Sequence, residues 1–395
     1  MLKSSRSHLG DLTSARDAAF CRRGRRSGFV TLRRASYLLL FALASGSFLH
    51  AAPCVPPDAM KPRLLANPDA ATLNELGIWF AGKEQYACSA NAFAASLQKE
   101  PTQQDMPNVV FMFGASLYLS GEIKEAVAAL QEAERLSVRN IRLNLILAAA
   151  FDSLHSTSDA ETNWRAALAI DPFSSAAYDG LSSDLVLDGN FAEIITLLEK
   201  PSILSQRTPV QSLNLGLAYA RTSRLEEAAR VLRDGLNTSP DSLPVANELA
   251  DVLTQLGRGQ EAVTVLDLAL EQHPEDTDTG IHLVETLMTA APERALETTQ
   301  KLLLASPQNW NLLYLNGVLE MKSGNLQQAR AHLEQSESLK ADFASSHEAL
   351  GVVLAQLKDM PGAQAQFEKA IALGDTNPEV RQNLSNVLKT LGKEN

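Results

Sequence analysis

The stretch LGLAYARTSRLEEAARVL (residues 215–232) contains the pattern that decides the fold of this chain. An apolar residue stands beside a small one, a turn follows, and then a small residue precedes a large apolar one by four positions. Apolar residues three and four apart lie on one face of an α-helix. The same order recurs in LYLSGEIKEAVAAL (117–130), LADVLTQLGRGQEAVTVL (249–266) and LNGVLEMKSGNLQQARAHL (315–333). The repeated unit is therefore predicted to be two helices joined by a turn.

The small residue in the first helix of each unit sets the register of the repeat. Seven of its nine intervals are 34 residues long, and the other two are 37 and 33. We expect small side chains here because the two helices of a pair approach closely, while large apolar residues fill the space around the crossing. The register places this position at Gly77, Gly114, Ala148, Ser182, Gly216, Ala250, Val284, Gly317, Gly351 and Ser385.

The second helix and the turn follow the same period. Its small position falls at Ser89, Ala126, Ala160, Ile194, Ala228, Ala262, Ala295, Ala329 and Ala363. Glycines suited to a left-handed residue at the end of the first helix stand at Gly121, Gly189, Gly257 and Gly324. Ile194 and Val284 are large for their positions, Thr299 replaces a large apolar residue, and the turn at 290–293 is one residue short. We therefore expect less ideal packing in the fourth and seventh units.

This pattern resembles the tetratricopeptide repeat, a 34-residue helix–turn–helix unit, over residues 70–391. The resemblance implies an all-α fold, a right-handed superhelical solenoid of about nine helix pairs with residues 378–391 as a capping helix. One helix pair cannot bury its apolar face alone, so each unit is stabilised by stacking on its neighbours.

The resemblance also implies a binding groove, because in this family positions 2, 5, 9 and 12 of the first helices face the concave surface. In this sequence those positions are mostly apolar, and they lack the basic cluster with which some family members clamp a carboxylate. They favour a partner segment with apolar side chains and basic flanks, although the same side chains can instead pack between repeats. The candidate partner-binding residues are Phe111, Tyr118, Arg142, Leu145, Leu213, Leu217, Asn247, Tyr314, Val318 and Met321.

The N-terminal 52 residues differ in character from the rest. They carry nine basic and two acidic side chains, and an Arg-rich stretch precedes an apolar run at 37–49 and then small residues. This is the order of a secretory signal peptide, and the run is shorter than the roughly 20 residues that span a bilayer. We predict export to the periplasm or the medium with cleavage near Ala51 or Ala52. The alternatives are an inner-membrane anchor at 37–49 and a lipoprotein at Cys54, which Pro53 disfavours.

Two cysteines remain after the predicted signal, Cys54 in a Pro-rich segment at 53–69 and Cys88 in the first predicted helix pair. In an oxidising compartment an even pair favours a disulfide. Two unpaired thiols, with Cys88 buried in a helix, are the alternative interpretation.

The charge and the residue types narrow the function. Residues 53–395 carry 26 Lys and Arg against 44 Asp and Glu, a net charge of −18, which disfavours binding to nucleic acid or to an anionic membrane. The sequence has no paired histidines at zinc spacing, no Cys-x-x-Cys and no glycine-rich phosphate loop. We therefore expect no enzyme activity, cofactor, metal or small-molecule substrate, and membrane contact only through an uncleaved N-terminal segment.

These observations predict a non-catalytic protein–protein interaction scaffold in a bacterial cell envelope that holds a protein or peptide partner in its groove. One alternative is an accessory subunit of an envelope assembly machine, or of a polysaccharide or outer-membrane export machine. A self-associating structural protein is the other.

Overall fold

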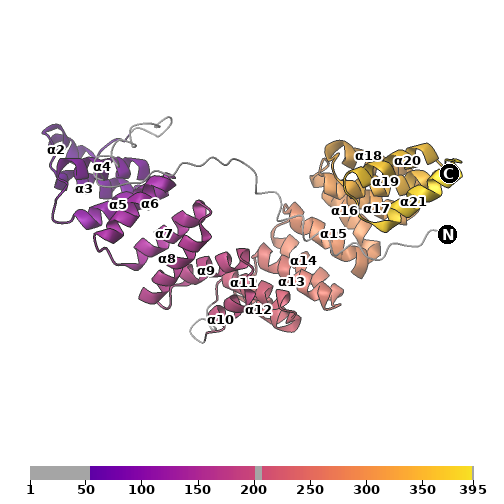
Figure 1. Ribbon diagram of the computed structural model, residues 1–395, viewed down its shortest axis with the longest axis horizontal. Coiled ribbons are helices and arrows are strands. Elements are labelled where there is room, and N and C mark those ends of the chain that lie inside the picture. The colour runs from indigo at the N-terminus through magenta and orange to yellow at the C-terminus, as the bar shows by residue number, and fades with distance from the viewer. Residues whose placement is uncertain (1–53, 201–206, 394–395) are drawn as a thin grey trace. The chain divides into compact units, whose positions relative to one another are not determined.

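The computed structural model describes residues 54–200 and 207–393, and all regular secondary structure in that part of the chain is helical (Figure 1). The all-α prediction is therefore confirmed. The predicted export segment lies outside the described residues, and none of the described helices is long and apolar enough to cross a membrane. Two compact units, divided after Thr102, are described separately.

The elements follow one another along the chain as helix pairs. Their bounds are η3 (Asp58–Met60), α2 (Lys61–Leu65), α3 (Ala70–Ala81), α4 (Tyr86–Lys99), α5 (Met106–Leu119), α6 (Ile123–Arg135), α7 (Ile141–Ser153), α8 (Thr157–Ile170), α9 (Ser175–Leu187), α10 (Phe191–Leu198), α11 (Pro209–Arg221), α12 (Leu225–Thr238), α13 (Leu243–Gln255), α14 (Gly259–Gln272), α15 (Thr277–Ala290), α16 (Pro292–Ala305), α17 (Trp310–Lys322), α18 (Leu326–Leu339), α19 (Ala344–Gln356), α20 (Met360–Ala372) and α21 (Pro378–Thr390). We call the odd-numbered member of each pair from α3 to α19 the first helix, and the even-numbered member the second helix.

The first unit consists of the pair α3 and α4 with the short helix α2 packed beside it. Met60 and Leu64 pack against a buried cluster that includes Leu76, Phe80 and Cys88. This contact removes apolar surface of the first pair from water, which is the role that a terminal cap has in a repeat array.

Two polar links and one covalent bond hold α2 in this place. The guanidinium group of Arg63 donates to Glu75 Oε2 at 2.6 Å and to Thr72 Oγ1 at 2.8 Å. A disulfide joins Cys54 to Cys88 of α4. The predicted Pro-rich segment is therefore tied to the first helix pair in the structure.

The second unit is a solenoid of eight further pairs, from α5/α6 to α19/α20, followed by α21. Each first helix packs on its own second helix, and each second helix packs on the first helix of the next pair. Because this order continues without interruption through the described part of the unit, its core is a continuous row of apolar layers rather than one central cluster.

In five pairs the two helices cross at the glycine of the predicted register. A Cβ atom at Gly216 would lie 2.6 Å from Cγ and Cδ2 of Leu232, well inside van der Waals contact. Leu232 is the large apolar residue predicted to face this position, and it is fully buried. The register is therefore confirmed at this pair. The same contact is made by Gly77 with Phe93, Gly114 with Leu130, Gly317 with Leu333 and Gly351 with Phe367.

The turns inside the pairs also keep the 34-residue period. Gly121, Gly189, Gly257 and Gly324 have φ angles between 70° and 90°. In the other pairs that have a left-handed residue at this place, it is Glu84, His155, Ser223 or Lys358, with φ between 58° and 69°. The seventh repeat, α15 and α16, differs from the others. Its turn passes through Ala291 with φ −153°, as expected for a turn that is one residue short.

The three residues that depart from the consensus are accommodated in the core. Ile194, Val284 and Thr299 are fully buried. The hydroxyl of Thr299 donates to the carbonyl of Ala295, one turn earlier in α16, at 2.7 Å, so this polar group is not left unpaired. Only Ala295 and Thr299 are buried in α16, and α10 spans just eight residues. These two irregular second helices, α10 and α16, belong to the fourth and seventh repeats, in which the sequence departs from its pattern.

Candidate partner-binding surface on the first helices

The ten residues predicted to face a partner lie on first helices of the second unit, at the edge of the core rather than inside it. Arg142 is exposed and the other nine are half-buried. We call this set the first-helix face. Its members are Phe111 and Tyr118 on α5, Arg142 and Leu145 on α7, Leu213 and Leu217 on α11, Asn247 on α13, and Tyr314, Val318 and Met321 on α17.

Some members of the first-helix face also pack against neighbouring repeats. The ring of Tyr314 meets that of Phe343, just before α19, edge-on with centroids 5.0 Å apart. Leu145 and Leu213 pack against the buried core of the middle repeats. The first-helix face therefore contributes to stability at these three positions, whatever it binds.

Polar side chains connect the first helices α13 and α15. Asn247 donates from Nδ2 to Thr279 Oγ1 of α15 at 2.9 Å. The ring of His282, also on α15, lies between Asn247 Oδ1 at 3.0 Å and Asp251 Oδ1 at 2.9 Å. Burial, and then the nearby charge of Asp251, raises the pKa of Glu248 to about 7. His282 therefore links the repeat of α13 to the repeat of α15.

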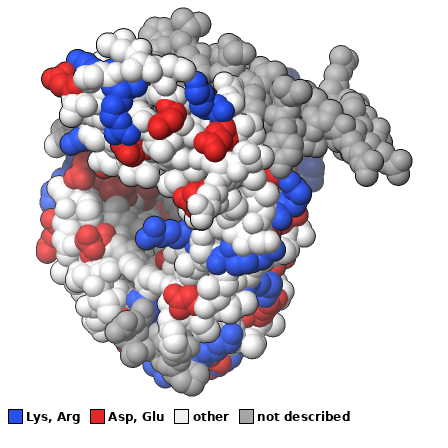
Figure 2. All heavy atoms as spheres, turned by 90° about the vertical axis from the view of Figure 1, so that its left-hand side faces the viewer, with Lys and Arg blue, Asp and Glu red and all other residues white. Residues whose placement is uncertain are grey.

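The second helices are connected by ion pairs at the surface. Arg165 pairs with Glu193 at 2.6 Å, and Arg233 pairs with Glu261 at 2.8 Å, each across one repeat boundary. Basic and acidic side chains are interspersed over the face of the molecule shown in Figure 2. Exposed pairs of this kind add little stability, and they engage these four charged side chains with one another. The apolar first-helix face is thus the better candidate for binding.

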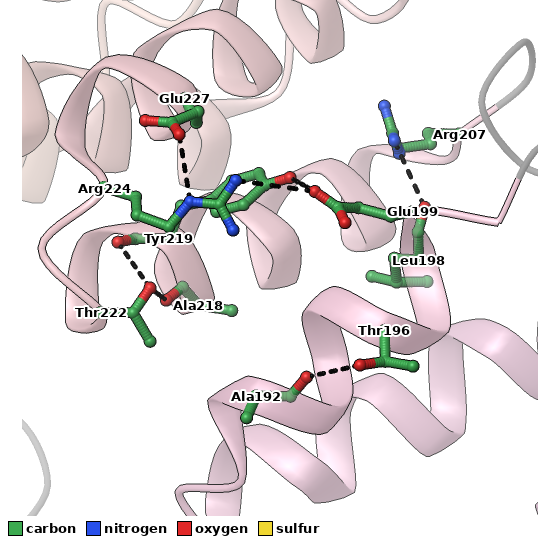
Figure 3. A network of polar contacts seen from close by, with 10 residues as sticks. All are labelled: Ala192, Thr196, Leu198, Glu199, Arg207, Ala218, Tyr219, Thr222, Arg224 and Glu227. Atoms are coloured by element: carbon green, nitrogen blue, oxygen red, sulfur yellow. Dashed lines mark hydrogen bonds and ion pairs between the residues drawn. The ribbon is translucent and has the colours of Figure 1, made fainter.

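A denser network fixes α10 and α11 to each other. The hydroxyl of Tyr219 bonds to the carboxylate of Glu199, and the guanidinium of Arg224 lies 4.4 Å from the ring centroid of Tyr219 (Figure 3). Arg224 also pairs with Glu227 at 3.1 Å. Burial and the bond to Glu199 raise the pKa of Tyr219 to about 12. These contacts tie the end of α10 to α11 and to the start of α12.

Sequence reasoning missed an acidic pair between the third repeat (α7 and α8) and the fourth repeat (α9 and α10). Asp184 of α9 is only 4% exposed, and it interacts with Asp152 of α7 and Trp164 of α8. Burial, and then the charge of Asp152, raises the pKa of Asp184 to about 7. The available signal was an aspartate at a position where the helix faces the core, between Leu181 and Leu185.

The described ranges contain no group of three His, Cys, Asp or Glu side chains that could hold a metal ion. We therefore treat the first-helix face as the candidate functional site.

Comparison with known proteins supports the repeat assignment. Two family models described as tetratricopeptide repeat match residues 219–279 and 314–378. Neither of them describes an enzyme. Among curated proteins, the BBSome complex member BBS4 of Bos taurus is 22% identical over 283 residues, which are 71% of this chain and 54% of that protein. A TPR repeat-containing protein of Pseudomonas aeruginosa is 29% identical over 174 residues, 42% of this chain and 29% of that protein. This chain thus spans about half of the bovine relative's length and under a third of the bacterial one's.

Solved structures give the same class of neighbours at low similarity. The APC/C hetero-tetramer Cut9-Hcn1 matches with a TM-score of 0.44 and 15% identity, covering 82% of this chain and 70% of that one. MamA of Desulfovibrio magneticus RS-1 matches with a TM-score of 0.37 and 22% identity, covering 42% of this chain and 94% of that one. The assignment to tetratricopeptide repeats therefore rests on the two family models and on the observed helix pairs. The chain contains tetratricopeptide repeats, and its described helix pairs stack as a solenoid of that type.

Proposed function

We propose that this chain is a non-catalytic scaffold of the bacterial cell envelope that holds a segment of a protein partner along its first-helix face. The observation that carries the proposal is the set of half-buried apolar side chains on four of the first helices, α5, α7, α11 and α17. Half-buried apolar groups lose their remaining contact with water when a partner covers them, and rigid helices keep them in place without a further loss of entropy.

Export is the second part of this proposal. It is supported by the signal-like order of residues 1–52 and by the disulfide between Cys54 and Cys88, because such bonds persist in oxidising compartments. Intact-mass analysis of the protein recovered from its native host tests this part. We expect a chain that begins close to Pro53 and contains one disulfide. A full-length chain with free thiols would contradict export.

The binding proposal can be tested with two matched substitutions of leucine. Leu217→Asp places a charge on the first-helix face, whereas Leu268→Asp makes the same change on the second helix α14, where the side chain is 53% exposed. Each variant, and the wild type, is used as bait in an envelope extract after crosslinking. We expect Leu217→Asp to lose most of the captured partner and Leu268→Asp to keep it. Equal capture by both variants would contradict binding at this face.

The same experiment separates the scaffold from its alternatives. The bovine relative is named as the member of a complex, and an accessory subunit of an envelope machine would be recovered with several proteins in fixed ratios. A self-associating structural protein would be recovered with further copies of itself alone.

A further inference from the structure

We propose that residues 54–66, which contain η3 and α2, form a lid on the first helix pair, and that the redox state of the Cys54–Cys88 disulfide closes and opens it. We call this segment the lid. The inference goes beyond the proposed scaffold function, because it concerns the first unit and not the first-helix face of the second unit. With the disulfide formed the lid covers α3 and α4, and after reduction it leaves them.

The surface under the lid is apolar. The lid contacts the first pair through Met60 and Leu64, which pack on a buried cluster of α3 and α4. Leu76 and Phe80 of α3 and Cys88 of α4 belong to that cluster, and all three are buried. Because these side chains regain contact with water when the lid leaves, the position of the lid decides whether this apolar surface is closed.

The lid's own contacts hold it only modestly. No residue of η3 or α2 is buried, and α2 has five residues, a length at which a helix is not stable by itself. The ion pair of Arg63 with Glu75 joins side chains that are 48% and 56% exposed, and exposed pairs add little stability. Arg63 also donates to Thr72 Oγ1 at 2.8 Å, and one such hydrogen bond shifts an equilibrium by roughly tenfold.

The disulfide contributes more than these contacts. With the bond formed, residues 54–69 are a loop whose two ends are both fixed to the first pair, at Cys88 and at Ala70, where α3 begins. Closing a loop of about 15 residues shifts an equilibrium by on the order of a hundredfold, because the open state loses most of its freedom. Reduction restores that freedom and therefore moves the lid toward the open state.

The helix pair beneath the lid has contacts that do not involve the disulfide. Gly77 of α3 lies against Phe93 of α4, since an added Cβ atom would come within 2.8 Å of the ring. The hydroxyl groups of Ser89 and Ser96 on α4 donate to backbone carbonyls of α3, at 2.8 Å and 3.1 Å. We therefore expect α3 and α4 to stay paired while the lid turns away at residues 67–69.

The two sulfur atoms differ in access, and this sets the course of the reduction. Cys54 is exposed, whereas Cys88 is buried in α4. A thiolate of an incoming dithiol therefore attacks Sγ of Cys54 and bonds to it, the bond to Cys88 breaks, and the Cys88 thiolate takes up a proton. The second thiol of the same dithiol then displaces Cys54 as a thiol, and the dithiol leaves as its cyclic disulfide. Two electrons pass to the protein, and an oxidised dithiol reverses both steps.

Proteolysis of the full chain measures opening of the lid, because a protease cuts a helix after the helix has opened locally. Thermolysin, which cuts before leucine and works in the presence of reductants, is added with dithiothreitol, with its oxidised form, or with neither. Mass spectrometry follows the cut before Leu64 and a reference cut before Leu304 of α16, which is 86% exposed. We expect the cut at Leu64 to become on the order of a hundredfold faster after reduction. Reoxidation should restore the slow rate, and the reference cut should not change.

Two cysteine variants make the test specific. Cys54→Ser cannot form the disulfide, so its lid should be cut at the fast rate in every condition. Cys21→Ser removes a cysteine outside the described residues and keeps both partners of the disulfide, so it is the matched control and should respond like the wild type. Hydrogen exchange of the same samples should show α3 and α4 protected in both redox states.

Two results would overturn the redox-controlled lid. Equal cutting at Leu64 in the oxidised and reduced chains would show that its other contacts hold the lid closed. Loss of exchange protection throughout α3 and α4 on reduction would show that the disulfide holds the whole pair together. Capture of the partner through Leu217 is measured separately, so failure of the lid leaves the proposed function standing.

Discussion

Replacing Gly216 with leucine tests the packing rule on which the fold depends. The new Cβ atom alone would lie 2.6 Å from Leu232, which is fully buried and belongs to the core of the middle repeats. Overpacking of this kind costs about 1–3 kcal/mol, and the better helix propensity of leucine returns somewhat less than about 1 kcal/mol. We expect a net loss of about 1 kcal/mol, seen in urea unfolding followed by circular dichroism.

Two further variants make this prediction specific. Gly82→Leu is the control, because a Cβ atom there meets only carbonyl oxygens at 3.6 Å, an ordinary contact. Leu232→Ala should by itself cost about 2–5 kcal/mol through the cavity it leaves. In the double variant with Gly216→Leu, the new side chain can occupy that space, so the two losses should not add. A urea midpoint equal to that of the wild type for Gly216→Leu would refute the close contact of α11 with α12 at Gly216. Strict additivity of the two losses in the double variant would refute it as well.

Three other predictions concern stability. Reduction of the Cys54–Cys88 disulfide, which joins positions 34 residues apart, should destabilise the first helix pair by about 3–4 kcal/mol; equal urea midpoints with and without a phosphine reductant would exclude this role. The pKa values of Asp184 and Glu248 are raised to about 7, so between about pH 4 and 7 the folded state binds protons that the unfolded state has lost. The free energy of unfolding should therefore fall as the pH rises through that window, by at most about 1.4 kcal/mol per unit for each group, and Asp184→Asn should flatten the profile. His347 is fully buried between Gln366 Oε1 at 2.7 Å and a backbone carbonyl at 3.0 Å, so His347→Ala should cost about 2–4 kcal/mol in the same unfolding measurement.

The sequence predicts the fold well because steric constraints repeat every 34 residues. Gly216 and Leu232 recur as a pair of positions in unit after unit, so each additional repeat tests the same register. The turn at 290–293 could be recognised as short for the same reason, and the structure has no left-handed residue at Ala291.

The details of the polar contacts could not be predicted in this way. Asp184 and Trp164 are brought together by the angle at which one repeat meets the next, and a 34-residue period carries no information about that angle. Tyr314 was predicted to be available for binding, and the structure shows its ring packed against Phe343 as well. Such contacts depend on residues that occur once in the chain, so no repetition in the sequence could indicate them.

Binding along the first helices is the central claim, and photo-crosslinking in living cells of the native host measures it most directly. A benzophenone amino acid is introduced at position 217 on α11 or at position 268 on α14, and the crosslinked products are identified by mass spectrometry. We predict that position 217 gives a discrete product with another protein and that position 268 gives none. Products of equal yield from both positions, or from position 268 alone, would contradict the account.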